Sequence, residues 1–165
     1  MEVGKTRTPP RHGTYSRVVS GASGRVLVVD DNRVIRQLIR VNLELEGFEV
    51  VTAADGVECL EVFEKVRPDL VTLDVVMPRL DGLRTVARLR AEPLASRVPV
   101  AIISACTRHE VESGLAAGAD AFLGKPFEPA ELVRMVRGLV GRERPAGPPG
   151  VDGRSGAGRA GSARG

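Results

Sequence analysis

The chain is notably poor in aromatic residues. It has 165 residues and contains no tryptophan, one tyrosine and four phenylalanines. A core built from this composition must be mainly aliphatic, with Val, Leu and Ala as its main side chains. The length is sufficient for one domain with a hydrophobic core.

Cysteine and long apolar runs are also scarce. The two cysteines, Cys59 and Cys106, lack the spacing of a metal site or a disulfide framework. We therefore expect reduced thiols, as in a cytoplasmic protein. No apolar run approaches the roughly 18 residues of a membrane span, and the N-terminus lacks the apolar segment of a signal peptide. The sequence predicts a cytoplasmic protein without a membrane partner.

The net charge of +3 is distributed unevenly along the chain. Both ends are basic and rich in small residues, whereas the middle is mildly acidic. We expect a disordered leader over 1–24, one folded domain over 25–141, and a disordered Gly/Pro/Arg tail over 142–165. The arginines at the ends are sparse, so nucleic-acid binding by the ends would be an accessory function at most, and we expect no dedicated nucleic-acid-binding domain.

The middle of the chain alternates between short apolar runs and amphipathic segments. Strands are predicted over 25–29, 48–52, 70–73, 98–103 and 119–123. Helices are predicted over 32–46, 55–66, 82–90, 107–117 and 128–140. This alternation predicts an α/β fold of the (βα)5 type, a doubly wound parallel five-stranded sheet. The expected strand order is 2-1-3-4-5, as in flavodoxin-like folds.

Two of the predicted helices differ in apolar character. The first carries an apolar stripe at helical spacing, expected to be buried: Val34, Leu38, Val41 and Leu45. Asp31 or Asn32 is a suitable N-cap for this helix. The fourth helix is weakly apolar, with Val111 and Leu115 as its expected anchors.

Charged and polar residues follow four of the predicted strands. Asp30 and Asp31 follow the first strand, Asp74 the third, Ser104 the fourth and Lys125 the fifth. The carboxyl ends of parallel strands share one edge of the sheet, where ligands bind. Neighbouring carboxylates raise each other's pKa unless a cation neutralises them, and oxygen ligands suit Mg²⁺.

This set of residues suits phosphoryl transfer to a carboxylate. A metal ion and Lys125 would neutralise the transferring group while Asp74 attacks it. Each residue alone also has an ordinary explanation. Asp31 could serve only as a helix cap, and Lys125 could be a solvated loop residue.

Taken together, the motifs resemble the receiver domain of two-component response regulators, the CheY-like superfamily. The resemblance covers about residues 25–140. Four segments carry it: VVDDN at 28–32, LDVVMPRLDG at 73–82, IISA at 102–105 and FLGKPF at 122–127.

The resemblance implies a magnesium-dependent phospho-acceptor site. Asp74 is similar to the acceptor that becomes 4-aspartylphosphate. Asp30 and Asp31 resemble the acidic pair that holds Mg²⁺, with Asp31 as the direct ligand. The backbone carbonyl of Val76 resembles the third protein ligand of the metal.

The resemblance also implies a conformational switch. Ser104 is similar to the switch hydroxyl, and Phe122 is similar to the switch aromatic, although it could also be an ordinary core residue. Lys125 resembles the phosphate-binding lysine, and Pro126 resembles the cis proline of the family.

By this resemblance, the expected function is that of a single-domain response regulator in a phosphorelay. It would accept a phosphoryl group from a histidine kinase or phosphotransfer protein, and it would catalyse only its own phosphorylation and dephosphorylation. No output-domain motif follows, so a stand-alone receiver is expected. Its output would be a separate protein, or a second copy in a homodimer, bound by the fourth helix, fifth strand and fifth helix.

Two alternatives and one departure from the family remain. The chain could be a phosphorylation-independent, receiver-like scaffold. It could also be a haloacid-dehalogenase-type phosphatase, but that family needs Asp-x-Asp, and the triplet here is Asp30-Asp31-Asn32. The departure concerns Val76 and Cys106, which are neither acidic nor amide residues at positions that flank the path of the attacking water in the family.

Overall fold

Five strands alternate with five helices in the computed structural model, which describes residues 23–105 and 107–142. The strands are β1 (Arg25–Val29), β2 (Glu49–Ala53), β3 (Leu70–Leu73), β4 (Val100–Ser104) and β5 (Ala121–Gly124). The helices are α1 (Arg33–Leu45), α2 (Gly56–Val66), α3 (Gly82–Ala91), α4 (Arg108–Ala117) and α5 (Pro129–Leu139). Cys106 lies outside the described residues, as do nearly all of the predicted leader and tail. The predictions for these parts of the chain are therefore not tested by the structure.

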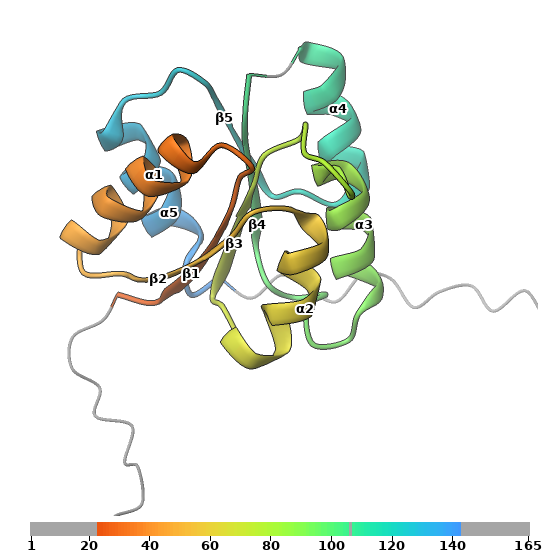
Figure 1. Ribbon diagram of the computed structural model, residues 1–165, viewed down its shortest axis with the longest axis horizontal. Helices are drawn as coiled ribbons and strands as arrows, with labels where there is room; N and C mark the ends of the chain where they lie inside the picture. The colour runs from red at the N-terminus through yellow and green to blue at the C-terminus, as the bar shows by residue number, and fades with distance from the viewer. Residues whose placement is uncertain (1–22, 106, 143–165) are drawn as a thin grey trace, which may run out of the picture.

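The strands form one parallel sheet in the order β2-β1-β3-β4-β5. Helices α1 and α5 cover one face, and α2, α3 and α4 cover the other (Figure 1). The predicted fold class and strand order are therefore confirmed. Because all five strands run in the same direction, their carboxyl ends meet at one edge.

The core consists of two aliphatic clusters, one on each face of the sheet. In β1, Val26 and Val28 point into the cluster under α1 and α5, while Leu27 and Val29 point into the opposite cluster. Both faces of the strand are buried, which explains why its sequence reads as a continuous apolar run. Within the described residues, no helix is long and apolar enough to cross a membrane.

The predicted buried stripe of α1 is wrong. The fully buried residues of this helix are Ile39 and Leu43. The predicted stripe is exposed instead: Val34 74%, Leu38 44%, Val41 42% and Leu45 79%. Helix α1 carries apolar residues on two faces, and the face that contains Ile39 and Leu43 packs on the sheet.

The anchors predicted for α4 are also wrong. Leu115 is 50% exposed and Val111 is only half-buried. The buried residue of α4 is Gly114, which faces the side chains of Ile102 and Phe122 in the sheet. Strands β4 and β5 each begin two residues later than predicted, within the usual uncertainty of element boundaries.

A buried hydroxyl on β3 suggests a stabilising substitution. Thr72 is 1% exposed, and its Oγ1 has no hydrogen-bond partner among the residues that the structure describes. Its sheet neighbours are Val28 and Ala101, both in the cluster under α1 and α5. Thr72→Val should therefore stabilise the domain by about 1 kcal/mol and raise its melting temperature by about 4 °C.

Thermal unfolding of the variant tests this prediction. Thr52→Val on the edge strand β2, where the side chain is only half-buried, controls for the strand preference of valine. An unchanged or lower melting temperature for Thr72→Val would contradict the prediction.

Candidate functional site

Three carboxylates meet at the carboxyl edge of the sheet. Asp30 and Asp31 follow β1, Asp74 follows β3, and one oxygen of each lies within 4.8 Å of the others. Asp30 is 1% exposed and Asp74 is 9% exposed, whereas Asp31 lies on the surface. The cluster is thus enclosed on one side and open to solvent at Asp31, as a site for a hydrated cation requires.

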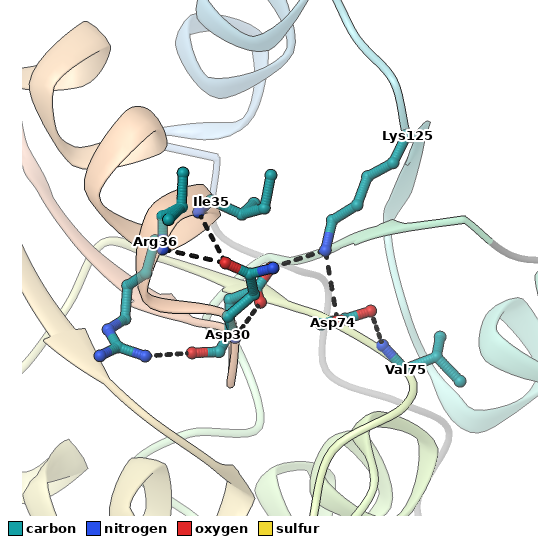
Figure 2. Close-up of polar contacts among 8 residues, drawn as sticks. Asp30, Ile35, Arg36, Asp74, Val75 and Lys125 are labelled. Carbon is teal, nitrogen blue, oxygen red and sulfur yellow. Dashed lines mark hydrogen bonds and ion pairs between the residues drawn. The ribbon is translucent and has the colours of Figure 1, made fainter.

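The segment after β1 is fixed by local hydrogen bonds. The Asn32 N–H donates to Asp30 Oδ1 at 2.9 Å, and Asn32 Oδ1 accepts from the N–H groups of Val34 and Ile35. Asn32, one of the two predicted candidates, is therefore the N-cap of α1, and Asp31 does not fill that role. From α1, Arg36 Nη1 donates to the carbonyl oxygen of Asp30 at 2.6 Å (Figure 2).

Lys125 reaches the cluster from the end of β5. Its Nζ lies 2.7 Å from Asp30 Oδ2 and 3.3 Å from Asp74 Oδ2, so it bridges the two carboxylates (Figure 2). The backbone N–H of Lys125 donates to the carbonyl oxygen of Ser104 at 3.1 Å, which aligns the ends of β5 and β4. The Lys125–Pro126 peptide bond is cis, as predicted.

Burial and pairing act together on the charges of this site. Burial raises the pKa of Asp30 above its usual value, although the hydrogen bond from Lys125 opposes this shift. Burial alone would lower the pKa of Lys125, but its hydrogen bonds to Asp30 and Asp74 and their charges hold it above the usual value. Lys125 therefore stays protonated at neutral pH. Three carboxylates and one ammonium leave an excess of negative charge, which suits a divalent cation.

The backbone holds Asp74 in one orientation. Its N–H donates to the carbonyl oxygen of Val29 at 3.0 Å, and the Val75 N–H donates to Asp74 Oδ1 at 2.7 Å. A Cβ on Gly82 would lie 2.1 Å from the carbonyl oxygen of Asp74, so the turn tolerates only glycine there. Oδ1 is thus held by the backbone, while Oδ2 faces Lys125 and the cluster. Val76, two residues further on, has a side chain that is 71% exposed.

The two predicted switch residues lie on β4 and β5. Ser104 is 3% exposed at the carboxyl end of β4, next to the edge that carries Asp74. Phe122 pairs in register with Ile102, and its half-buried ring lies against Gly114 of α4. The structure therefore gathers the three aspartates and Lys125 into one cluster, whereas Phe122 lies apart from it beneath α4.

An ion pair that the sequence does not indicate joins two loops bordering the site. Arg79, in the β3–α3 loop, has a φ of 64° and places Nη2 2.6 Å from Asp55 Oδ2. Asp55 is the N-cap of α2 and accepts a hydrogen bond from the Glu58 N–H at 2.9 Å. This bond and the Arg79 guanidinium hold the pKa of Asp55 below its usual value, although burial opposes the shift. The partners are 24 residues apart, and no local motif indicates the pair.

Comparisons with known proteins agree with this geometry. Residues 26–137 match the family model described as the response regulator receiver domain. The "Response regulator MprA" of Mycobacterium leprae is 43% identical over 122 residues, which cover 73% of this chain and 53% of MprA. The chain thus spans about half the length of the curated relatives it matches.

Solved structures are similar over most of the described chain. The chemotaxis protein CheY4 of Vibrio cholerae has 34% sequence identity and a TM-score of 0.67, covering 70% of this chain and 97% of CheY4. The receiver domain of the sensor histidine kinase PA1611 from Pseudomonas aeruginosa has 33% identity and a TM-score of 0.68, covering 73% and 99%. The PA1611 structure contains a magnesium ion coordinated in its active-site cleft.

Proposed function

Because the chain belongs to the response regulator receiver family of two-component systems, we propose that Asp74 accepts a phosphoryl group from a histidine kinase or a phosphotransfer protein. The placement of Asp74 carries the proposal. One of its carboxylate oxygens is held by the Val75 N–H, and the other faces Lys125 Nζ at 3.3 Å. The family match gives no support to the haloacid-dehalogenase alternative.

The residues at the carboxyl edge of the sheet have different roles in phosphoryl transfer. Asp30, Asp31 and Asp74, with the Val76 carbonyl, would hold Mg²⁺, which when bound would supply positive charge for the oxygens of the transferring group. A carboxylate oxygen of Asp74 attacks the phosphorus atom. The bond from phosphorus to the donor's histidine nitrogen breaks, and that nitrogen keeps the electron pair. Lys125 stabilises the charge of the phosphoryl group once it is on Asp74.

We propose that phosphorylation is relayed through β4 and β5. The Ser104 hydroxyl then donates a hydrogen bond to a phosphoryl oxygen, and this stabilises the Phe122 ring in the space beneath α4, where it lies against Gly114. The weak anchoring of α4 favours its movement, because few buried contacts mean a low local opening energy. The α4–β5–α5 face would bind a downstream protein or a second copy of the chain. The stand-alone form and the limitation of catalysis to the chain's own phosphorylation stay predictions.

An exposed apolar stripe on α1 suggests where a protein donor docks. We define the α1 stripe by its four residues: Val34, Leu38, Val41 and Leu45. It begins next to Asp31 and follows one face of the helix away from the carboxylate cluster. A donor that presents a histidine to Asp74 must cover this edge of the sheet. We propose that helices of the donor pack on the α1 stripe, since its spacing suits helix–helix packing.

Leu38→Glu should slow phosphotransfer from a protein donor by roughly tenfold or more, because it places an unpaired charge in an apolar contact. Uptake from acetyl phosphate, which needs no docking surface, should be unchanged. The donor for this assay is the autophosphorylated kinase that transfers fastest to the wild type in a panel. Leu94→Glu is the matched control, since Leu94 is 62% exposed in the loop between α3 and β4. This loop precedes the amino end of β4, whereas the carboxylate cluster lies at the carboxyl ends of the strands. Equal slowing with both phosphoryl sources would contradict the docking proposal.

The apolar side chain of Val76 should give the phosphorylated state a long lifetime. This side chain is exposed beside the site and cannot hydrogen-bond to an attacking water. Val76→Asn should shorten the half-life of the phosphorylated protein by roughly tenfold, which is less than a positioned general base contributes. Val76→Leu, which remains apolar, should behave as the wild type. Mass spectrometry over time measures the loss, and an unchanged half-life in Val76→Asn would rule out this explanation.

A further inference from the structure

Helix α4 meets the sheet at a glycine. Gly114 is the buried residue of this helix, and a Cβ on it would lie 2.7 Å from Ile102 Cδ1 and 2.9 Å from Phe122 Cε2. A third atom, Phe122 Cζ, would lie 3.1 Å away. Side chains in proteins pack at about 3.5–4.0 Å between carbon atoms. The helix and the Phe122 ring are therefore closer than any side chain at position 114 would permit.

The two neighbours of Gly114 differ in their freedom to move. Ile102 is 0% exposed and lies inside the cluster beneath α2, α3 and α4, so its side chain is enclosed by packed atoms. Phe122 is only half-buried and lies at the margin of the same cluster. A side chain at position 114 would therefore displace the Phe122 ring toward solvent, or it would lift α4 from the ring. In either case the contact between ring and helix is lost.

We propose that Gly114 is the positioning residue of the switch, because its missing side chain leaves the space in which the Phe122 ring lies beneath α4. The inference rests on the proposed function, in which phosphorylation at Asp74 stabilises the ring in that space. Gly114 thereby couples the ring to the helix. A side chain at this position uncouples them and disfavours the phosphorylated arrangement.

A matched pair of substitutions isolates the contact. Gly114→Ala and Gly138→Ala both lie within helices, where alanine is favoured over glycine. A Cβ on Gly138 of α5 meets no atom within 4 Å, whereas a Cβ on Gly114 meets the ring. The melting temperature should rise for Gly138→Ala and fall for Gly114→Ala. A rise in both variants would overturn the proposal.

Double variants identify the neighbour that clashes. Phe122→Leu removes the ring atoms nearest to position 114, and Ile102→Val removes Cδ1. In the Gly114→Ala background, Phe122→Leu should recover most of the lost stability and Ile102→Val should recover little. Recovery by Ile102→Val alone would overturn the assignment to the ring. The comparison remains decisive if Gly114→Ala alone does not fold, since rescue of folding is then the readout.

Binding of beryllofluoride with Mg²⁺ tests the coupling itself. The chain has four phenylalanines, so ¹³C-phenylalanine NMR can follow the Phe122 ring while calorimetry measures affinity. In Gly114→Ala the Phe122 signal should shift, and beryllofluoride should bind about tenfold more weakly, a difference of about 1.4 kcal/mol. Gly138→Ala should match the wild type.

The outcomes separate this inference from the function it rests on. If the wild type does not bind beryllofluoride, the proposed function fails. If the wild type binds and Gly114→Ala binds equally well, the role of Gly114 is overturned while the proposed function stands. A shifted Phe122 signal with unchanged affinity overturns the coupling in the same way.

Discussion

Replacing Lys125 with methionine should reduce phosphoryl uptake from acetyl phosphate by roughly a hundredfold or more and should also destabilise the domain. Lys125 Nζ lies 2.7 Å from Asp30 and 3.3 Å from Asp74, where it faces the charge that develops on the transferring group. Removing one preorganised donor of this kind typically costs a factor of about 10²–10³ in rate. The substitution also leaves Asp30, which is 1% exposed, without its cation, at a cost of about 3 kcal/mol.

The loss of stability in Lys125→Met should depend on pH. Burial already raises the pKa of Asp30 above 3.8, and loss of the ammonium raises it further. When a carboxyl group has a higher pKa in the folded state than in the unfolded state, the folded protein loses stability as the pH rises through the folded-state pKa. The stability gap between wild type and variant should therefore be small below about pH 4 and widen toward neutral pH.

Urea unfolding across this pH range measures the gap. Lys65→Met is the matched control, because Lys65 is exposed on α2 and lies outside the carboxylate cluster. It should change neither phosphoryl uptake nor the pH profile. A gap for Lys125→Met that stays constant from acidic to neutral pH would show that the pairing with Asp30 does not cause it.

Asp74→Asn should abolish phosphoryl uptake and preserve the fold. The amide keeps an oxygen that can accept the hydrogen bond from Val75, and it removes one of the crowded negative charges. It cannot form the acyl phosphate, because an amide oxygen is a poor nucleophile compared with a carboxylate. Magnesium affinity should also fall, since one of the three carboxylates is lost.

Intact mass after incubation with acetyl phosphate and Mg²⁺ checks the loss of uptake. Asp81→Asn is the control, because Asp81 caps α3 outside the carboxylate cluster and asparagine caps helices equally well. This control should take up one phosphoryl group, as the wild type should. If the chain were instead a phosphorylation-independent scaffold, the wild type and Asp74→Asn would bind the partner protein with the same affinity.

The fold and the gathering of the carboxylates were predictable from local signals. Asp30 and Asp74 each follow a strand of nearly continuous apolar residues, and Lys125 follows the last strand. Parallel strands bring such residues to one edge whatever the details of packing. The cluster therefore depends on the order of the elements, which the alternating pattern predicts well.

The orientation of α1 could not be predicted in this way. Val34 and Leu38 repeat at the same spacing as Ile35 and Ile39, so periodicity cannot decide which pair faces the sheet. The path of the chain from β1 through the Asn32 cap decides it, and this is a property of the folded structure. The apolar residues left exposed form the α1 stripe, the proposed docking surface for the donor.

Contacts without a side-chain signal were missed for a different reason. Gly114 is buried because it has no side chain, so a search for apolar anchors passes over it and selects Leu115. Arg79 and Asp55 pair across two loops, and each residue alone resembles an ordinary surface charge. Such features depend on how separate elements pack against one another in the folded chain.

Chemical mapping of the phosphorylated residue shows directly whether Asp74 is the phospho-acceptor. The wild type is incubated with acetyl phosphate and Mg²⁺, reduced with borohydride, which converts an aspartyl phosphate to homoserine, and digested for peptide mass spectrometry. We expect homoserine at position 74, in a reaction that requires Mg²⁺. Modification at Asp30 or Asp31 instead, or no modification of any carboxylate, would contradict it.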